Sequence, residues 1–211
     1  MPLQPLSVLI PSFIVLVLSL SFHEAAHAWT ADRLGDPTAR RLGRVSLNPL
    51  VHIDWIGTVL LPIIAAVSNL PLIGWAKPVP VDPRNLRHPQ RDFAIVAVAG
   101  PMSNLVLATG AAIARALVSA ANRQPGPIGD QLEHMLLLMV LINVLLAVFN
   151  MIPVPPLDGG NVAIGVLPAP LANAVARLRP WGFLVLYGLM FSGVLWWITE
   201  PVSNAILNWL L

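Results

Sequence analysis

The sequence predicts an all-α integral membrane protein with about four full transmembrane helices, one re-entrant or half-membrane helix and a short extended or hairpin segment. Three observations support this prediction. Apolar residues make up 56% of the 211 residues and charged residues only 10%, whereas about 25% of the residues in a soluble domain are charged. Apolar segments long enough to cross a bilayer recur along the chain. The charges gather between those segments, as they do in loops at a membrane surface.

Five apolar segments follow one another along the chain. Their approximate bounds are 6–30, 55–70, 92–121, 131–151 and 181–199. A spanning helix needs about 20 residues, so four of the five are long enough and the second, which contains Pro62, is marginal. The first lacks a basic leading region and a small-residue cleavage site, so we interpret it as a retained span and not as a signal peptide.

The stretch 71–91 differs in composition from the apolar segments around it. It is rich in proline and glycine, and because prolines forbid a helix there we expect it to be extended or hairpin-like. No repeat or linker divides the chain, so we expect one membrane domain over 1–211, with a core at about 6–160 and a final span at about 181–199. The absence of cysteine excludes disulfides and thiolate metal sites.

One cluster of ionisable residues lies inside the first apolar segment. His23, Glu24 and His27 form an H-E-x-x-H motif on a predicted helix, which places both imidazoles on one face where they can bind one metal ion. The glutamate beside the first histidine can accept a proton from a water molecule activated by that metal. Ionisable groups are costly within a span and mark functional sites, although a buried polar cluster that only helps helices to pack is the alternative.

A catalytic zinc ion usually has three protein ligands and one position for water, so a third ligand is needed. The remaining candidates near apolar segments are His52, His88, His134, Asp54, Asp92, Asp130, Glu133, Asp158 and Glu200. We favour Asp158, which follows three prolines and precedes two glycines in an otherwise uncharged stretch. Irregular backbone at membrane depth occurs only where it is buried or lines a wet cavity. An ordinary Asp-Gly turn is the alternative.

Several motifs in order resemble the site-2 protease family of intramembrane zinc metalloproteases. They are the H-E-A-A-H motif, the sequence AGPMSN at 99–104 and the sequence NMIPVPPLDG at 150–159. The sequence NPLVHID at 48–54, followed by Gly57, is similar to a compact prokaryotic branch of that family. The resemblance covers about residues 22–160, which is most of the chain.

The resemblance implies an active site of known composition. It implies one Zn²⁺ ion per chain, held by the histidine pair and Asp158, with Glu24 activating the water. It also implies that Asn150 lies near the substrate or its oxyanion, and that Asn104 packs near the site. We expect the chain to lack the peptide-binding or nucleotide-sensing domain of larger relatives, which leaves substrate selection and regulation open.

Two further sets of residues are candidates for accessory roles. His52 and Asp54 could support or gate the metal site, or they could form a polar pair that caps the helix of the second segment, and the two interpretations weigh equally. Gly74, Trp75 and Ala76 lie in the extended stretch. Their backbone groups could pair with an unwound substrate that adds as a strand.

The expected ligands constrain the topology. If segment 55–70 crossed the membrane, Asp158 would arrive on the side opposite the histidine pair, so we expect this segment to be re-entrant. Ten of the twelve lysines and arginines then lie on one side, and only Arg115 and Arg123 on the other. Because positive loops face the cytoplasm, we expect a prokaryotic cytoplasmic-membrane protein with its N-terminus outside and its active site toward the cytoplasm.

The expected reaction is hydrolysis of a peptide bond in or near the transmembrane segment of a membrane protein, with a single-span protein or stub as substrate. The lipid bilayer is the other expected partner, nucleic acid is not expected, and the oligomeric state is left open. One alternative is a metal-binding transporter, which would need further sites along its path. Others are a non-proteolytic relative, which would be free to lose Glu24, and another membrane hydrolase, because H-E-x-x-H sets the water chemistry and not the bond cleaved.

Overall fold

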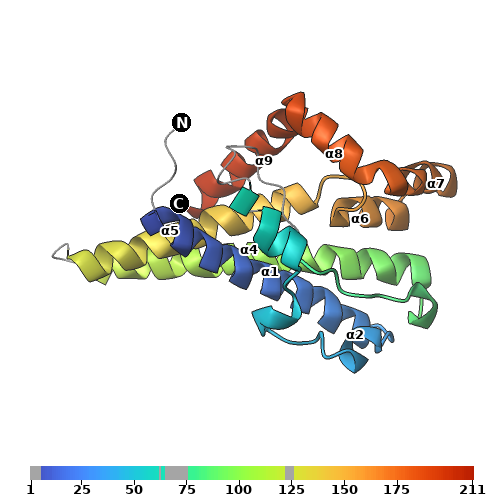
Figure 1. The fold of residues 1–211 in the computed structure, drawn as a ribbon, viewed down its shortest axis with the longest axis horizontal. Coiled ribbons are helices and arrows are strands. Elements are labelled where there is room, and N and C mark those ends of the chain that lie inside the picture. The colour runs from blue at the N-terminus through green and yellow to red at the C-terminus, as the bar shows by residue number, and fades with distance from the viewer. Residues whose placement is uncertain (1–5, 62, 65–75, 122–125) are drawn as a thin grey trace.

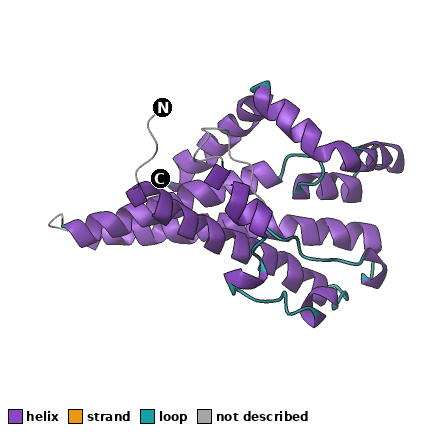
Figure 2. Cartoon of the chain, in the orientation of Figure 1, coloured by secondary structure: helices purple, strands orange, loops and turns teal. Residues whose placement is uncertain are grey.

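The computed structural model describes residues 6–61, 63–64, 76–121 and 126–211, and most of them are helical (Figure 1). Figure 2 shows helices joined by short loops and turns, and none of the described residues forms a strand. The structure therefore confirms the prediction of an all-α protein.

Three long helices form the centre of the fold. They are α1 (Leu6–Arg33), α4 (Pro89–Ala121) and α5 (Pro127–Asn150). Each contains a stretch that is long and apolar enough to cross a membrane, which agrees with three of the predicted spans. In Figure 1, α4 runs antiparallel to both α1 and α5 along the length of the molecule. The three helices thus form an apolar bundle suited to a bilayer.

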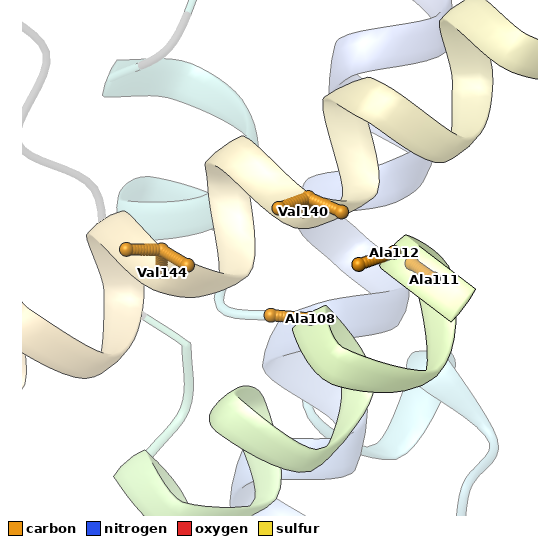
Figure 3. Packing of buried hydrophobic residues seen from close by; sticks show 5 residues of the cluster. All are labelled: Ala108, Ala111, Ala112, Val140 and Val144. Atoms are coloured by element: carbon orange, nitrogen blue, oxygen red, sulfur yellow. The ribbon is translucent and has the colours of Figure 1, made fainter. Parts of the chain in front are cut away.

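Small residues allow α4 and α5 to pack closely. Ala108, Ala111 and Ala112 of α4 meet Val140 and Val144 of α5 in one buried cluster (Figure 3). Helices in a membrane gain little from hydrophobic transfer between one another, so close van der Waals contact across small side chains is a main source of their association. The C-terminal helix α9 (Val194–Leu210) packs on the same cluster through three partly buried side chains.

The chain between α1 and α4 leaves and returns at the same end of the bundle. It contains α2 (Thr38–Arg41) and three short helical turns, η1 (Pro49–Val51), η2 (Trp55–Leu60) and η3 (Pro83–Asn85). The Arg87 N–H donates to Leu34 O at 3.3 Å, immediately after α1. The segment between the two helices therefore makes no net crossing of the bundle.

Asp36 joins the two ends of this connection. Its buried carboxylate accepts hydrogen bonds from the Asp82 N–H at 2.7 Å and from Asn85 Nδ2 at 2.9 Å. Burial alone would raise the pKa of Asp36, but these bonds, together with those from Thr38, outweigh it and lower the pKa below its ordinary value. The ionised carboxylate therefore holds the start of α4 against the end of α1.

The stretch predicted to be extended or hairpin-like is described only from Ala76 onward. Residues 76–82 have no regular structure, η3 follows, and α4 begins at Pro89. A hairpin is not formed within 76–88, because the backbone amides there bond to separate partners instead of to a neighbouring strand. Gly74 and Trp75 lie outside the described residues.

The C-terminal region is a series of shorter helices. They are α6 (Asp158–Val166), α7 (Ala169–Arg177), the turn η4 (Arg179–Trp181), α8 (Gly182–Phe191) and α9 (Val194–Leu210). The prediction of one helix over 181–199 is corrected here, because the helices on either side of Ser192 and Gly193 meet at 78°. Gly193 adopts a left-handed φ of 76°, which glycine accepts at no steric cost and which ends a helix.

Candidate metal centre

Three side chains from two helices converge at one point in the bundle. His23 and His27 lie one turn apart on α1, and Asp158 is the first residue of α6. The two Nε2 atoms are 3.1 Å apart. His23 Nε2 lies 3.0 Å from Asp158 Oδ2, and His27 Nε2 lies 3.3 Å from Asp158 Oδ1. The predicted ligands therefore meet, with candidate ligand atoms all within 4.8 Å of one another.

Glycines after Asp158 allow α6 to begin close to the turn that precedes it. A Cβ atom on Gly159 would lie 2.5 Å from Ile152 O, and one on Gly160 would lie 2.5 Å from Pro155 N. Neither position can hold a larger residue without moving the backbone. The two glycines are therefore needed for close packing between α6 and the preceding turn. This packing places Asp158 next to the histidine pair.

The Nδ1 atom of each imidazole forms a hydrogen bond with an oxygen acceptor. His23 Nδ1 donates to Asn104 Oδ1 at 2.6 Å, and His27 Nδ1 donates to the backbone carbonyl of Val96 at 2.7 Å. With the proton on Nδ1, the neutral form of each imidazole presents the lone pair of its Nε2 toward Asp158. This arrangement fixes tautomer and ring orientation in the way that metal-binding histidines require.

A buried polar chain holds Asn104 in place. Its Nδ2 donates to Asn143 Oδ1 at 2.8 Å, and Asn143 Nδ2 donates to Ser19 Oγ at 2.9 Å. All three side chains are fully buried, and they come from α4, α5 and α1. The amide of Asn104 is thereby oriented with its oxygen toward His23. Neither Ser19 nor Asn143 was predicted from the sequence, although a polar residue inside an apolar span is itself a signal.

The donor set fits a zinc ion. Two imidazole lone pairs and a carboxylate face one another, and such acceptors repel unless a cation or a proton lies between them. Asp158 Oδ2 is buried and accepts no hydrogen bond from the described part of the chain. Two histidines and one acidic residue form a recognised ligand set of catalytic zinc. The residues present therefore suit Zn²⁺ and leave a coordination position open.

Gly100 of α4 provides the space that the imidazoles occupy. A Cβ atom there would lie 2.6 Å from His23 Nε2 and still closer to His27 Nε2. The glycine was part of the AGPMSN motif, but the sequence did not show that it faces the two histidine rings. Its role is steric, because any side chain would enter the position where both ligand nitrogens converge.

We expect Gly100→Ala to lower zinc affinity by about 10- to 100-fold, the range typical of residues that orient metal ligands. The added methyl group displaces both Nε2 atoms, while helix propensity at this position improves. Equilibrium zinc binding, measured with a competing chelator, checks this. Gly110→Ala on the same helix is the matched control, since no atom lies within 4 Å of a Cβ there. Equal affinities for the two variants would contradict the prediction.

Glu24 is buried beside the candidate metal ligands and is held by the backbone of a distant loop. Its Oε2 accepts a hydrogen bond from the Val79 N–H at 3.0 Å. No second hydrogen bond to this carboxylate comes from the residues that the structure describes, so its other oxygen is available for a proton. The acid therefore has both a fixed orientation and a free acceptor.

Three of the remaining predicted residues form hydrogen bonds with groups other than the three converging side chains. Asp54 caps η2, because its Oδ1 accepts from the N–H groups of Ile56 and Gly57, which agrees with the capping interpretation. His52 is buried and its Nε2 bonds to Ser46 O at 2.8 Å. Asn150 Nδ2 donates to Leu146 O within its own helix.

Ala76 is the only described residue of the three predicted backbone contacts for substrate. It is buried and lies three residues before Val79, so it belongs to the same loop that reaches Glu24. Any pairing of this loop with a substrate strand stays a prediction.

Comparison with known proteins finds a peptidase family and relatives that are named as zinc metalloproteases. The model of peptidase family M50 matches residues 118–185. "Putative zinc metalloprotease YwhC" of Bacillus subtilis is 32% identical over 95% of this chain and 89% of its own length. "Putative zinc metalloprotease Rip2" of Mycolicibacterium smegmatis is 29% identical over 85% of this chain and 66% of its own. No solved structure matches the chain.

Proposed function

Because the chain belongs to peptidase family M50, the site-2 proteases, we propose that the residues of its active site are His23, His27 and Asp158 as zinc ligands and Glu24 as general base. Membership of this family makes the protein an intramembrane zinc metalloprotease. The observation that supports the ligand assignment most directly is the convergence of two Nε2 lone pairs on one carboxylate.

The reaction is hydrolysis of a peptide bond. When bound, zinc polarises the scissile carbonyl and lowers the pKa of water toward neutrality. The free oxygen of Glu24 accepts the proton of the attacking water and then transfers it to the leaving nitrogen. The Val79 N–H holds the other carboxylate oxygen and so keeps Glu24 in one orientation during both transfers. Asn104 and Val96 keep the two imidazoles aligned.

The substrate we propose is a membrane protein that presents a transmembrane segment, cleaved in or near that segment. The histidine pair lies within the apolar stretch Leu9–Arg33, so the scissile bond must reach membrane depth. A helical substrate hides its amides in hydrogen bonds and must unwind locally before attack. We retain Asn150 and the loop around Ala76 as candidate substrate contacts near the site, and a single-span protein as the simplest substrate.

The orientation we propose places the metal centre toward the cytoplasm and the N-terminus outside. The basic residues on the proposed cytoplasmic side are Arg33, Arg40, Arg41, Arg44, Lys77, Arg84, Arg87, Arg91, Arg177 and Arg179. The contact between Leu34 and Arg87 supports this grouping, because it joins the end of α1 to the start of α4. Segment 55–70, of which residues 62 and 65–70 lie outside the described part of the chain, is proposed to be re-entrant, and the prokaryotic cytoplasmic membrane is the proposed location.

Single cysteines test this orientation directly, since the chain has none of its own. We expect Arg40→Cys and Arg84→Cys to react with a membrane-impermeant maleimide only in inverted vesicles. We expect Arg123→Cys to react in intact cells. Labelling of the first two positions from opposite faces would contradict the proposed topology.

Purified protein incubated with a panel of transmembrane substrates tests the function. Cleavage that a zinc chelator abolishes and added zinc restores is the expected result. Cleavage that persists after complete zinc removal would contradict the proposed mechanism. The alternative of a metal transporter predicts zinc uptake into proteoliposomes without cleavage. It is disfavoured because the described residues form only one group of three candidate ligands, whereas transport needs sites along a path.

A further inference from the structure

Arg44 is a buried arginine that bonds to backbone instead of to an acid. It lies between α2 and η1, and only 6% of its surface is exposed. Its Nη2 donates to Lys77 O at 2.6 Å and to Pro78 O at 3.0 Å. No carboxylate in the described part of the chain forms an ion pair with it. Burying a cation costs free energy unless it is well hydrogen bonded. The hydrogen bonds to the two carbonyls offset this cost, and they hold the guanidinium and the loop together.

These carbonyls immediately precede the amide that holds the proposed general base. The next residue, Val79, donates its N–H to Glu24 Oε2 at 3.0 Å. Val79 lies between Pro78 and Pro80, whose rings fix φ and stiffen the backbone on both sides. A shift of the carbonyls at 77 and 78 is therefore passed to the Val79 amide.

The same segment is tied at its beginning by a second contact. The Lys77 N–H donates to His52 O at 2.8 Å, and the His52 ring is itself held by Ser46 O. Arg44, His52 and Glu24 thus contact three consecutive residues. His52 therefore holds the loop through its backbone carbonyl, and the Arg44 side chain supplies the bond to Pro78 O, the carbonyl directly before the Val79 amide.

We propose that Arg44 is a positioning residue for Glu24, acting through the peptide of residues 77–79. This inference rests on the proposed role of Glu24 as general base. Within the described residues, the Arg44 side chain bonds to Lys77 O and Pro78 O and to none of the zinc ligands, so we expect its removal to leave the metal site intact. Loss of the two bonds frees the loop, and the carboxylate of Glu24 then loses its fixed orientation relative to the attacking water.

The test compares Arg44→Met with Arg44→Lys and with Arg41→Met, an exposed arginine three residues earlier that serves as the matched control. We expect Arg44→Met to lower kcat by about 10- to 100-fold, because displacements near 1 Å in an active site cost about 10²-fold. Its zinc content and KM stay at wild-type values. Arg44→Lys recovers part of kcat, since an ammonium group can still donate to carbonyls. Arg41→Met behaves as wild type.

A second variant keeps the inference testable if Arg44→Met fails to fold. Val79→Pro removes the N–H that Glu24 accepts and leaves Arg44 in place. We expect it to lower kcat with zinc retained, and we expect the double variant to be no worse than the poorer single one, since both act on one contact. Additive losses in the double variant would overturn the inference, as would a fall in zinc content or a change confined to KM in Arg44→Met or Val79→Pro.

The results distinguish a failure of the positioning role of Arg44 from a failure of the proposed function. If the wild type does not cleave, or Glu24→Gln cleaves equally well, the proposed function fails whatever Arg44 does. If Glu24→Gln is inactive and both Arg44→Met and Val79→Pro keep wild-type kcat, only the positioning role fails.

Discussion

Replacing Glu24 by glutamine lowers kcat by about 10²- to 10⁴-fold, the contribution expected of a general base, while the protein keeps its zinc. Glutamine has the shape of glutamate, and its carbonyl oxygen can still accept the Val79 N–H. Glutamine cannot take a proton from water. The chemical step is therefore lost, whereas zinc binding is retained. Cleavage rates and elemental analysis of the same preparation measure the two effects separately.

Glu200→Gln is the control for this substitution, because Glu200 lies exposed on α9 and should leave cleavage unchanged. A Glu24→Gln protein that binds zinc and cleaves at the wild-type rate would exclude Glu24 as the base. A protein that loses zinc together with activity would instead show that Glu24 supports the metal.

Replacing Asp158 by asparagine removes the negative ligand and weakens zinc binding by more than about 100-fold, beyond the range for residues that merely orient ligands. Cleavage is lost with the metal. The metal-free protein behaves differently, because an asparagine amide can donate to the imidazole Nε2 atoms that face Asp158 at 3.0 and 3.3 Å. We therefore expect the metal-free variant to be at least as stable as the metal-free wild type.

Thermal unfolding with and without zinc checks both parts of this prediction. Zinc should raise the Tm of the wild type, since a ligand that binds only the folded state stabilises it, and it should not raise the Tm of Asp158→Asn. Asp130→Asn, at an exposed position in the first turn of α5, should respond to zinc as the wild type does. An equal zinc-induced shift in Asp158→Asn would remove Asp158 from the ligand set.

The parts of the site that local geometry determines could be predicted from the sequence. His23 and His27 are four residues apart, and any helix places such residues on one face, so their cooperation needs no knowledge of the fold. The long apolar segments were equally local signals, and three of them are the long helices α1, α4 and α5. Asp158 required an argument from chemistry, since zinc needs a third ligand and few acids are available.

The break at Gly193 shows where apolar composition alone was insufficient. Residues on both sides of it are apolar, so the pattern favoured one span over 181–199. A single left-handed glycine redirects the chain by 78° without changing the composition. The same limit applies to His52, whose partner Ser46 and carbonyl contact with Lys77 depend on how one loop folds over another.

The sequence by itself determined the chemistry of this protein: an apolar chain, a pair of imidazoles with an adjacent acid, and a third ligand that could complete a zinc site. Only the tertiary structure decided how those groups are held. Asn104, Asn143 and Ser19 orient His23 from three different helices, and Arg44 fixes the loop that reaches Glu24. These hydrogen bonds join residues far apart in the chain, and no local periodicity specifies such pairs.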